Sequence, residues 1–215
     1  MEGVRACLPP VFLVLAVLPS LSAQSDLMKL LRRVEDRYNR PRTLRLGFEQ
    51  SLSGKGRITR TESGELYLAK PGRMRWNYTA PAGKFFLSDG RFFYYYSPGA
   101  RQVTRARVKD SDDLRAPLAF LMGRLDFQRD FKEFRTYPEG SNTYIVATPK
   151  SERAPYTQVA FLVEPDARIQ LLRVTGQDQS VLVYRFSGEQ ANAPLAPAMF
   201  EFKLPPDAQL VDEDR

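Results

Sequence analysis

The chain has 215 residues, a formal net charge of +7 at pH 7, one cysteine and no histidine. If an export signal removes Cys7, the mature chain excludes Ser-His-Asp and Cys-His catalysis, the usual zinc and copper sites, and disulfide bonds. The positive charge favours anionic partners such as a membrane surface, an acidic protein or nucleic acid.

The N-terminus has the layout of a secretory signal peptide. Arg5 precedes an apolar stretch at 11–18, which is too short to span a bilayer, and small residues follow up to Ala23. We predict a signal peptide at 1–23, with cleavage after Ala23 or, as the close competitor, after Ser22. Residues 24–215 then form one exported domain.

Two amphipathic helices are predicted. Ser25 can cap the first helix and Pro41 ends it. The apolar stripe of this helix consists of Leu27, Leu30, Leu31, Val34 and Tyr38. The second lies within 112–125, where acidic residues lead and Pro117 suits the first turn. Its stripe consists of Leu118, Leu121 and Met122.

The rest of the chain indicates an antiparallel sheet. From Thr43 the apolar period changes to two, with Leu44, Leu46 and Phe48 on one face of a strand. Further strand-like runs lie at 84–88, 91–96, 102–108, 144–148, 157–164, 168–175, 181–187 and 199–204. About ten strands and two or three helices favour one mainly β domain (α+β), with the helices packed against a single face of the sheet.

A hairpin centred on Pro71-Gly72 is the most informative segment. Leu66 and Leu68 alternate before this pair, which is typical of a type II turn. Met74, Trp76 and Tyr78 alternate after it, so both strands place bulky apolar groups on one face.

The run 92–96 consists of five aromatic residues, which puts large rings on both faces of one strand. One face therefore packs under helices or binds an apolar ligand. Stacking on nucleic-acid bases is the alternative for basic and aromatic residues together, but export argues against a nucleic-acid partner.

Other patterns that could suggest a catalytic or ligand site have simpler structural explanations. The glycines and lysine at 53–57 lack phosphate-loop spacing and indicate a hairpin. The acidic clusters at 110–113 and 212–214 could suggest a glycosidase or metal site, but a helix start and a solvated tail explain them better. We therefore expect no enzyme activity, no metal and no cofactor.

The ordered set of motifs resembles the LolA family of periplasmic lipoprotein carriers, over nearly all of the mature chain. The matching segments are 48–50, 63–68, 70–78, 88–90, 148–150 and 200–206. The resemblance implies a single curved antiparallel sheet forming an unclosed β-barrel, with a lid of two to three helices over its concave face.

The resemblance also implies a function in the periplasm. The protein would shield the acyl chains of lipoproteins and carry them from an inner-membrane ABC transporter to an outer-membrane receptor, as a soluble monomer without a cofactor. The acyl-chain cavity would be lined by Leu46, Phe48, Leu68, Met74, Trp76 and Tyr78. The lid would contribute Leu30, Leu31, Val34, Leu118, Leu121 and Met122. Lys70 stands where the family often has an arginine with a role in lid closure and transfer.

Two alternatives stay open at this point. The same cavity could carry another lipid or a glycolipid, and nothing in the sequence distinguishes these ligands. The protein could instead be a non-catalytic adaptor of an envelope complex that uses its basic outer surface. An apolar cavity large enough for acyl chains would count against the adaptor.

Overall fold

The computed structural model describes residues 21–54, 57–108 and 125–213. The helical elements of these residues are α1 (Leu21–Asn39), η1 (Pro98–Ala100), α2 (Phe127–Asp130) and η4 (Pro197–Phe200). The strands are β1 (Thr43–Gly54), β2 (Arg57–Ala69), β3 (Arg73–Ala80), β4 (Phe85–Asp89), β5 (Phe92–Ser97), β6 (Gln102–Arg107), β7 (Phe131–Glu139), β8 (Asn142–Pro149), β9 (Tyr156–Val163), β10 (Ile169–Gly176), β11 (Val181–Ala191) and β12 (Gln209–Asp212).

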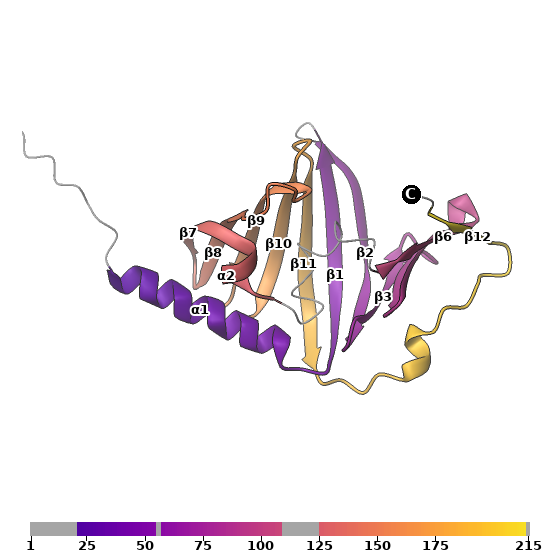
Figure 1. Cartoon of the computed structure of the whole chain (residues 1–215), viewed down its shortest axis with the longest axis horizontal. Coiled ribbons are helices and arrows are strands. Elements are labelled where there is room, and N and C mark those ends of the chain that lie inside the picture. Colours follow the sequence, from indigo (N-terminus) through magenta and orange to yellow (C-terminus); the bar gives the residue numbers. More distant parts are fainter. Residues whose placement is uncertain (1–20, 55–56, 109–124, 214–215) are drawn as a thin grey trace, which may run out of the picture.

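All 12 of these strands belong to one curved sheet (Figure 1). Their order is β12-β6-β5-β4-β3-β2-β1-β11-β10-β9-β8-β7, and the two terminal strands do not pair, so the barrel is unclosed. The predicted fold class is thus confirmed. One pairing differs from the prediction, because β12 runs parallel to β6.

Strand β1 shows why the period-two pattern predicted this sheet. Leu44, Leu46 and Phe48 are buried, whereas Arg45 and Glu49, in the alternate phase of the strand, are exposed. After β2 the chain turns back through Pro71-Gly72 into β3, and Gly72 has the positive φ of +68° that its position in the turn required. The peptide bond between Lys70 and Pro71 is cis, which the sequence did not predict.

Helix α1 packs its apolar stripe against the sheet. Its described residues run from Leu21, upstream of the predicted cap at Ser25, to Asn39, just before Pro41. In Figure 1 it runs along the half of the sheet formed by β7 to β11. Within the described residues no helix has the length and apolar character needed to cross a membrane. The stripe of the second predicted helix, Leu118, Leu121 and Met122, lies outside the described residues, as does most of the predicted signal peptide.

The two faces of the sheet have separate cores. The face against which α1 packs, called the inner face below, carries the main cluster of buried side chains. The outer face carries two smaller clusters, both completed by the segment 195–208. The aromatic strand β5 serves both: Phe93 belongs to the inner core, and Tyr94 stacks on Phe202 of the outer segment with ring centroids 4.0 Å apart.

The prediction of a strand at 199–204 is wrong. This segment begins in η4, and Phe200 is buried against Tyr67 on the outer face. Its alternating apolar residues pack onto the sheet through side chains instead of extending it through backbone hydrogen bonds. Prolines at 197, 205 and 206 lack the N–H group that strand pairing requires.

Candidate functional site

The six predicted cavity residues lie together on the inner face of three adjacent strands. The residues of these strands pair in rows across the sheet, and each row has a β2 residue between its partners on β1 and β3. The rows are Leu44, Leu68 and Met74; Leu46, Leu66 and Trp76; and Phe48, Gly64 and Tyr78. Five of the six predicted residues have an exposed fraction of 5% or less. The sixth, Tyr78, is half-buried and packs against the same cluster.

A contact between rings crosses the middle strand of this surface. Phe48 of β1 and Tyr78 of β3 meet edge-to-face with ring centroids 5.1 Å apart, although β2 lies between their strands. Gly64 makes this possible because it adds no side chain. A Cβ atom at Gly64 would lie 2.1 Å from the carbonyl oxygen of Asn77.

Several residues of the same surface were not among the predicted cavity residues. Leu44 and Leu66 share the phase of the predicted residues, so the alternation already contained the signal for them. Tyr184 and Phe186 come from β11, which pairs with β1 from the far end of the chain. Tyr184 lies 5.6 Å from Trp76 between ring centroids, and no local pattern could place it there.

The part of the predicted lid that lies in α1 packs on the inner face along β7 to β11. Leu31 and Val34 are fully buried in the main core, and Leu30 packs partly buried at its margin. Along its side, α1 and the segment 125–128 line a cleft of about 270 Å³. Along β7 to β11, the inner face is therefore covered by α1.

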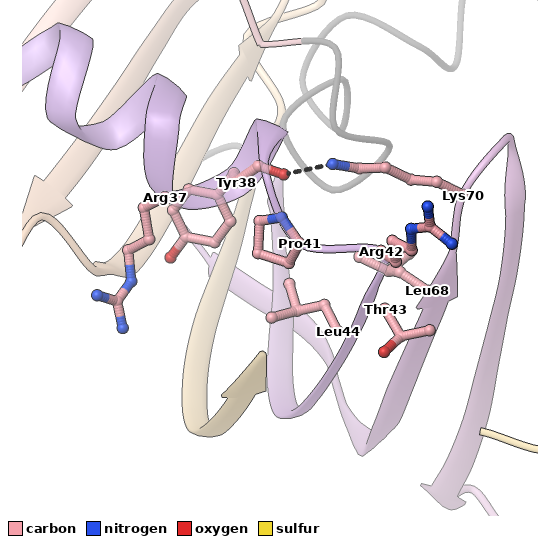
Figure 2. Close-up of a pocket in the computed structure, with 8 residues that line it drawn as sticks. All are labelled: Arg37, Tyr38, Pro41, Arg42, Thr43, Leu44, Leu68 and Lys70. Atoms are coloured by element: carbon pink, nitrogen blue, oxygen red, sulfur yellow. Dashed lines mark hydrogen bonds between the residues drawn. The ribbon is translucent and has the colours of Figure 1, made fainter. Parts of the chain in front are cut away.

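Lys70 contacts the C-terminal end of α1 (Figure 2). Its Nζ donates a hydrogen bond to the carbonyl oxygen of Tyr38 at 3.2 Å and a second one to that of Asn39. These carbonyls have no partner within the helix and carry the negative end of its dipole. Desolvation lowers the pKa of Lys70. A cavity of only about 10 Å³ remains between Lys70 and the helix end.

Side chains of α1 make further polar contacts near the same end. The hydroxyl of Tyr38 donates to Glu189 at 2.8 Å and accepts from the backbone N–H of Ile169 at 2.8 Å, while burial raises the pKa of Tyr38. Arg37 forms an ion pair with Glu189 at 2.8 Å. One turn earlier, Glu35 accepts from the backbone N–H of Phe127 at 2.8 Å. Polar bonds thus hold the last two turns of α1.

A buried polar cluster lies at one end of the inner face, and the sequence analysis did not identify it. Lys84 donates to both carboxylate oxygens of Glu62, at 2.7 and 2.6 Å, and both side chains are only 3% exposed. Gln50 donates to the same carboxylate at 2.5 Å, and Arg60 approaches it at 3.1 Å. The sequence signal was the phase of Glu62, which falls on the apolar face of β2.

Comparisons with known proteins agree with this fold. A family model described as "Outer membrane lipoprotein carrier protein LolA" matches residues 40–203. An outer-membrane lipoprotein carrier protein of Azotobacter vinelandii is 30% identical over 207 residues, covering 94% of this chain and 98% of that protein. A protein of the same name from Nitrosospira multiformis is 28% identical over 173 residues, covering 80% and 83%.

A solved structure is similar in fold alone. The crystal structure of an uncharacterized conserved protein from Thermus thermophilus matches with a TM-score of 0.54 and 14% identity, covering 87% of this chain and 99% of that one. The family model covers most of the chain, and the relative from Azotobacter vinelandii spans nearly all of it. This chain belongs to the LolA family.

Proposed function

We propose that the protein carries lipoproteins through the periplasm by shielding their acyl chains on the inner face of the sheet. Family membership and relatives named outer-membrane lipoprotein carrier proteins support this proposal. The single observation that carries it is the amphipathic helix α1 packed on a surface of large apolar side chains. Such a helix occupies space that acyl chains could take.

The energetics require a shield of this kind. Each methylene of an acyl chain that is kept out of water contributes about 0.8 kcal/mol, so a free lipoprotein would not leave a membrane unaided. The lining residues of the proposed site are Leu46, Phe48, Leu68, Met74, Trp76 and Tyr78. They offer large, adaptable contacts because three are aromatic and one is methionine.

We propose that α1 acts as the lid over this site. Leu30, Leu31 and Val34 would occupy the site when no cargo is bound, and Lys70 would favour the closed position through its bonds to the helix end. The second part of the proposed lid, with Leu118, Leu121 and Met122, lies outside the described residues. Cargo competes with the lid, so only molecules with an open lid can bind it. The apparent affinity for cargo is therefore lower than the affinity of the open form, which makes release easier.

The proposed partners follow from this role. An inner-membrane ABC transporter would supply the lipoprotein, and an outer-membrane receptor would take it over. Transfer between binding sites needs no covalent step, so the proposal includes no catalytic residue, metal or cofactor. The positive net charge favours acidic surfaces on the partners.

A solubility assay tests the proposal. Purified protein without residues 1–23 is mixed with a triacylated lipoprotein in detergent, the detergent is diluted, and the mixture is separated by gel filtration. The deacylated lipoprotein serves as the cargo control. Trp76→Glu places a charge on the inner face, and Tyr137→Glu makes the same change at a half-exposed position on β7.

We expect a soluble complex with the triacylated lipoprotein only, and we expect Trp76→Glu but not Tyr137→Glu to lose it. Equal complex formation by the deacylated cargo would contradict the proposal and favour an adaptor that uses the outer surface. Preferential binding of a glycolipid added in competition would instead favour the lipid carrier. A folded Trp76→Glu variant, shown by an unchanged far-ultraviolet circular dichroism spectrum, is needed for the comparison.

A further inference from the structure

We infer that the inner face contains a polar subsite that binds the carbonyl oxygens of acyl ester or amide groups, at the head of the acyl chains. The subsite comprises Trp76, Gln50 and the Lys84–Glu62 pair. This inference rests on the proposed function and extends it, because it says which part of the cargo is recognised besides the hydrocarbon.

The ion pair is the first observation. Lys84 and Glu62 are both buried. Glu62 lies at an inward-facing position of β2, and Lys84 directly precedes β4. The ring of Tyr78, a proposed lining residue, lies 4.1 Å from the Lys84 ammonium, and its hydroxyl donates to Gln50 at 3.3 Å. The pair is therefore continuous with the apolar surface and is not a separate surface feature.

A purely structural role explains this pair poorly. Removing two charges from water is costly, and replacing a buried ion pair by apolar residues of similar size is often neutral or stabilising. The next inward position after Lys84 is Phe86 on β4, which pairs with Trp76 of β3. Leu66 lies two inward positions beyond Glu62 on β2. A retained charge pair on such a face points to a polar group that binds beside it.

Trp76 is the second, independent observation. Its side chain is 3% exposed, and its Nε1 has no hydrogen-bond partner among the described residues. A buried donor without an acceptor costs about 1–3 kcal/mol. The indole packs against Phe48 and Tyr184, and Tyr184 pairs with Gln50 across β1 and β11. An acceptor on a ligand would satisfy the free N–H in this neighbourhood.

The available groups select a neutral acceptor. An ammonium group has three donor hydrogens and an amide NH₂ has two, so Lys84 and Gln50 can each donate beyond their bonds to Glu62. Lys84 already bonds both carboxylate oxygens of Glu62, which the more exposed Arg60 also approaches, so an anion that binds Lys84 would compete with that carboxylate. A carbonyl oxygen can accept a hydrogen bond without disturbing the pair. Acyl chains joined through esters and amides carry this acceptor.

The test compares two synthetic lipopeptides of equal chain length. One carries two ester-linked palmitoyl chains on its glyceryl group, and the other carries two hexadecyl chains in ether linkage, which lack the carbonyl oxygens. Affinity is measured by displacement of a hydrophobic dye. Because Trp76 is the single tryptophan, its indole N–H gives one resonance in a ¹⁵N–¹H spectrum and reports its own hydrogen bond.

Two double variants distinguish an effect of the buried ion pair from an effect of removing any ion pair. Glu62→Leu with Lys84→Met removes the buried pair, and apolar groups of similar size allow the chain to fold. Arg105→Met with Asp212→Leu removes a more exposed ion pair between β6 and β12 and is the matched control.

We expect the ester lipopeptide to bind about three- to tenfold more tightly than the ether, the increment of one or so hydrogen bonds. Only the ester should shift the indole N–H resonance downfield. The preference should fall in the Glu62→Leu, Lys84→Met variant and persist in the control variant. Equal affinities with equal indole shifts would overturn the inference and leave the carrier function intact. Binding of neither lipopeptide would contradict the carrier function and, with it, this inference.

Discussion

Lys70 shows how one side chain can set the position of a helix. Its ammonium bonds two carbonyl groups at the end of α1, where the helix dipole is negative. A lysine lacks the planar fork of an arginine, but its three donors suffice for two acceptors that lie side by side. The contact supports the proposed role of Lys70 in lid closure.

We expect Lys70→Met to destabilise the protein by about 1 kcal/mol, the net contribution of such bonds near a surface. Amide hydrogen exchange in the last turn of α1 should become faster, because the helix end is released. Lys70→Arg should restore slow exchange. Arg42→Met removes a neighbouring positive charge that lines the same small cavity and should leave exchange unchanged. Equal exchange in Lys70→Met and the wild type would contradict the proposed role.

Glu35 gives the contact between α1 and α2 a pH dependence. Burial and the nearby carboxylates of Asp126 and Asp36 raise the pKa of Glu35. Together they outweigh the bond from the Phe127 N–H and the charge of Arg32, which lower this pKa. The folded state therefore binds this proton more readily than the unfolded state. The resulting stabilisation is present below the unfolded pKa of 4.5 and is lost as the pH rises through the folded pKa.

Replacement of Glu35 by Gln removes this titration and keeps an oxygen that can accept from Phe127. We expect the melting temperature of the wild type, measured relative to Glu35→Gln, to rise as the pH falls from about 7 to about 4. Other titrating groups are common to both proteins, so they cancel in the difference. A difference that stays constant with pH would show that Glu35 keeps its ordinary pKa.

Single residues also show where sequence reasoning ended. Phe48, Met74 and Trp76 could be predicted to share a face because a strand has a period of two. The same rule applied to β2 puts Glu62 on that face, although the sequence analysis did not single it out, and only the structure shows that Lys84, 22 residues later, reaches it. Nothing local to either residue indicates that partner.

At the scale of elements, strands β1, β2 and β3 form one apolar surface because the middle strand has no side chain at its glycine. Gly64 lets Phe48 and Tyr78 meet across β2, and it allows β3 to approach closely. A methyl group there would collide with the backbone of β3, which cannot move without breaking strand pairs.

We therefore expect Gly64→Ala to cost about 2 kcal/mol or more in the free energy of unfolding by urea, as overpacking against backbone does. Gly54→Ala is the matched control, since a Cβ atom at Gly54 would meet nothing within 4 Å. It should change stability by no more than about 0.5 kcal/mol. Similar losses in both variants would contradict the role assigned to the close approach of β3 at Gly64.

Helices and strands could be predicted where a local sequence pattern determines them. The helix α1 and the hairpin β2–β3 have clear periods and a clear turn, and both were predicted. The segment 199–204 shares the alternation of a strand, yet it packs on the outer face through Phe200 and Phe202. Alternation reports which side chains are buried, and it does not report whether the backbone pairs.

For the whole molecule, the pairing of β1 with β11 creates the inner face. It joins strands from the two ends of the domain, so that Tyr184 and Phe186 complete the surface begun by β1 to β3. Such long-range pairing depends on the packing of all elements together, and the sequence indicated it only through resemblance to a family. Helix α1 packs along the β7 to β11 half of the same inner face and contributes to the same buried core.

The most direct test of the account asks whether an acyl chain reaches the inner face. Bromine atoms quench tryptophan fluorescence on contact, and Trp76 is the single tryptophan. A triacylated lipopeptide with brominated chains is titrated into the mature protein, and an unbrominated one is the control. We expect strong quenching by the brominated lipopeptide only. Saturated binding without quenching would place the acyl chains elsewhere and contradict the account.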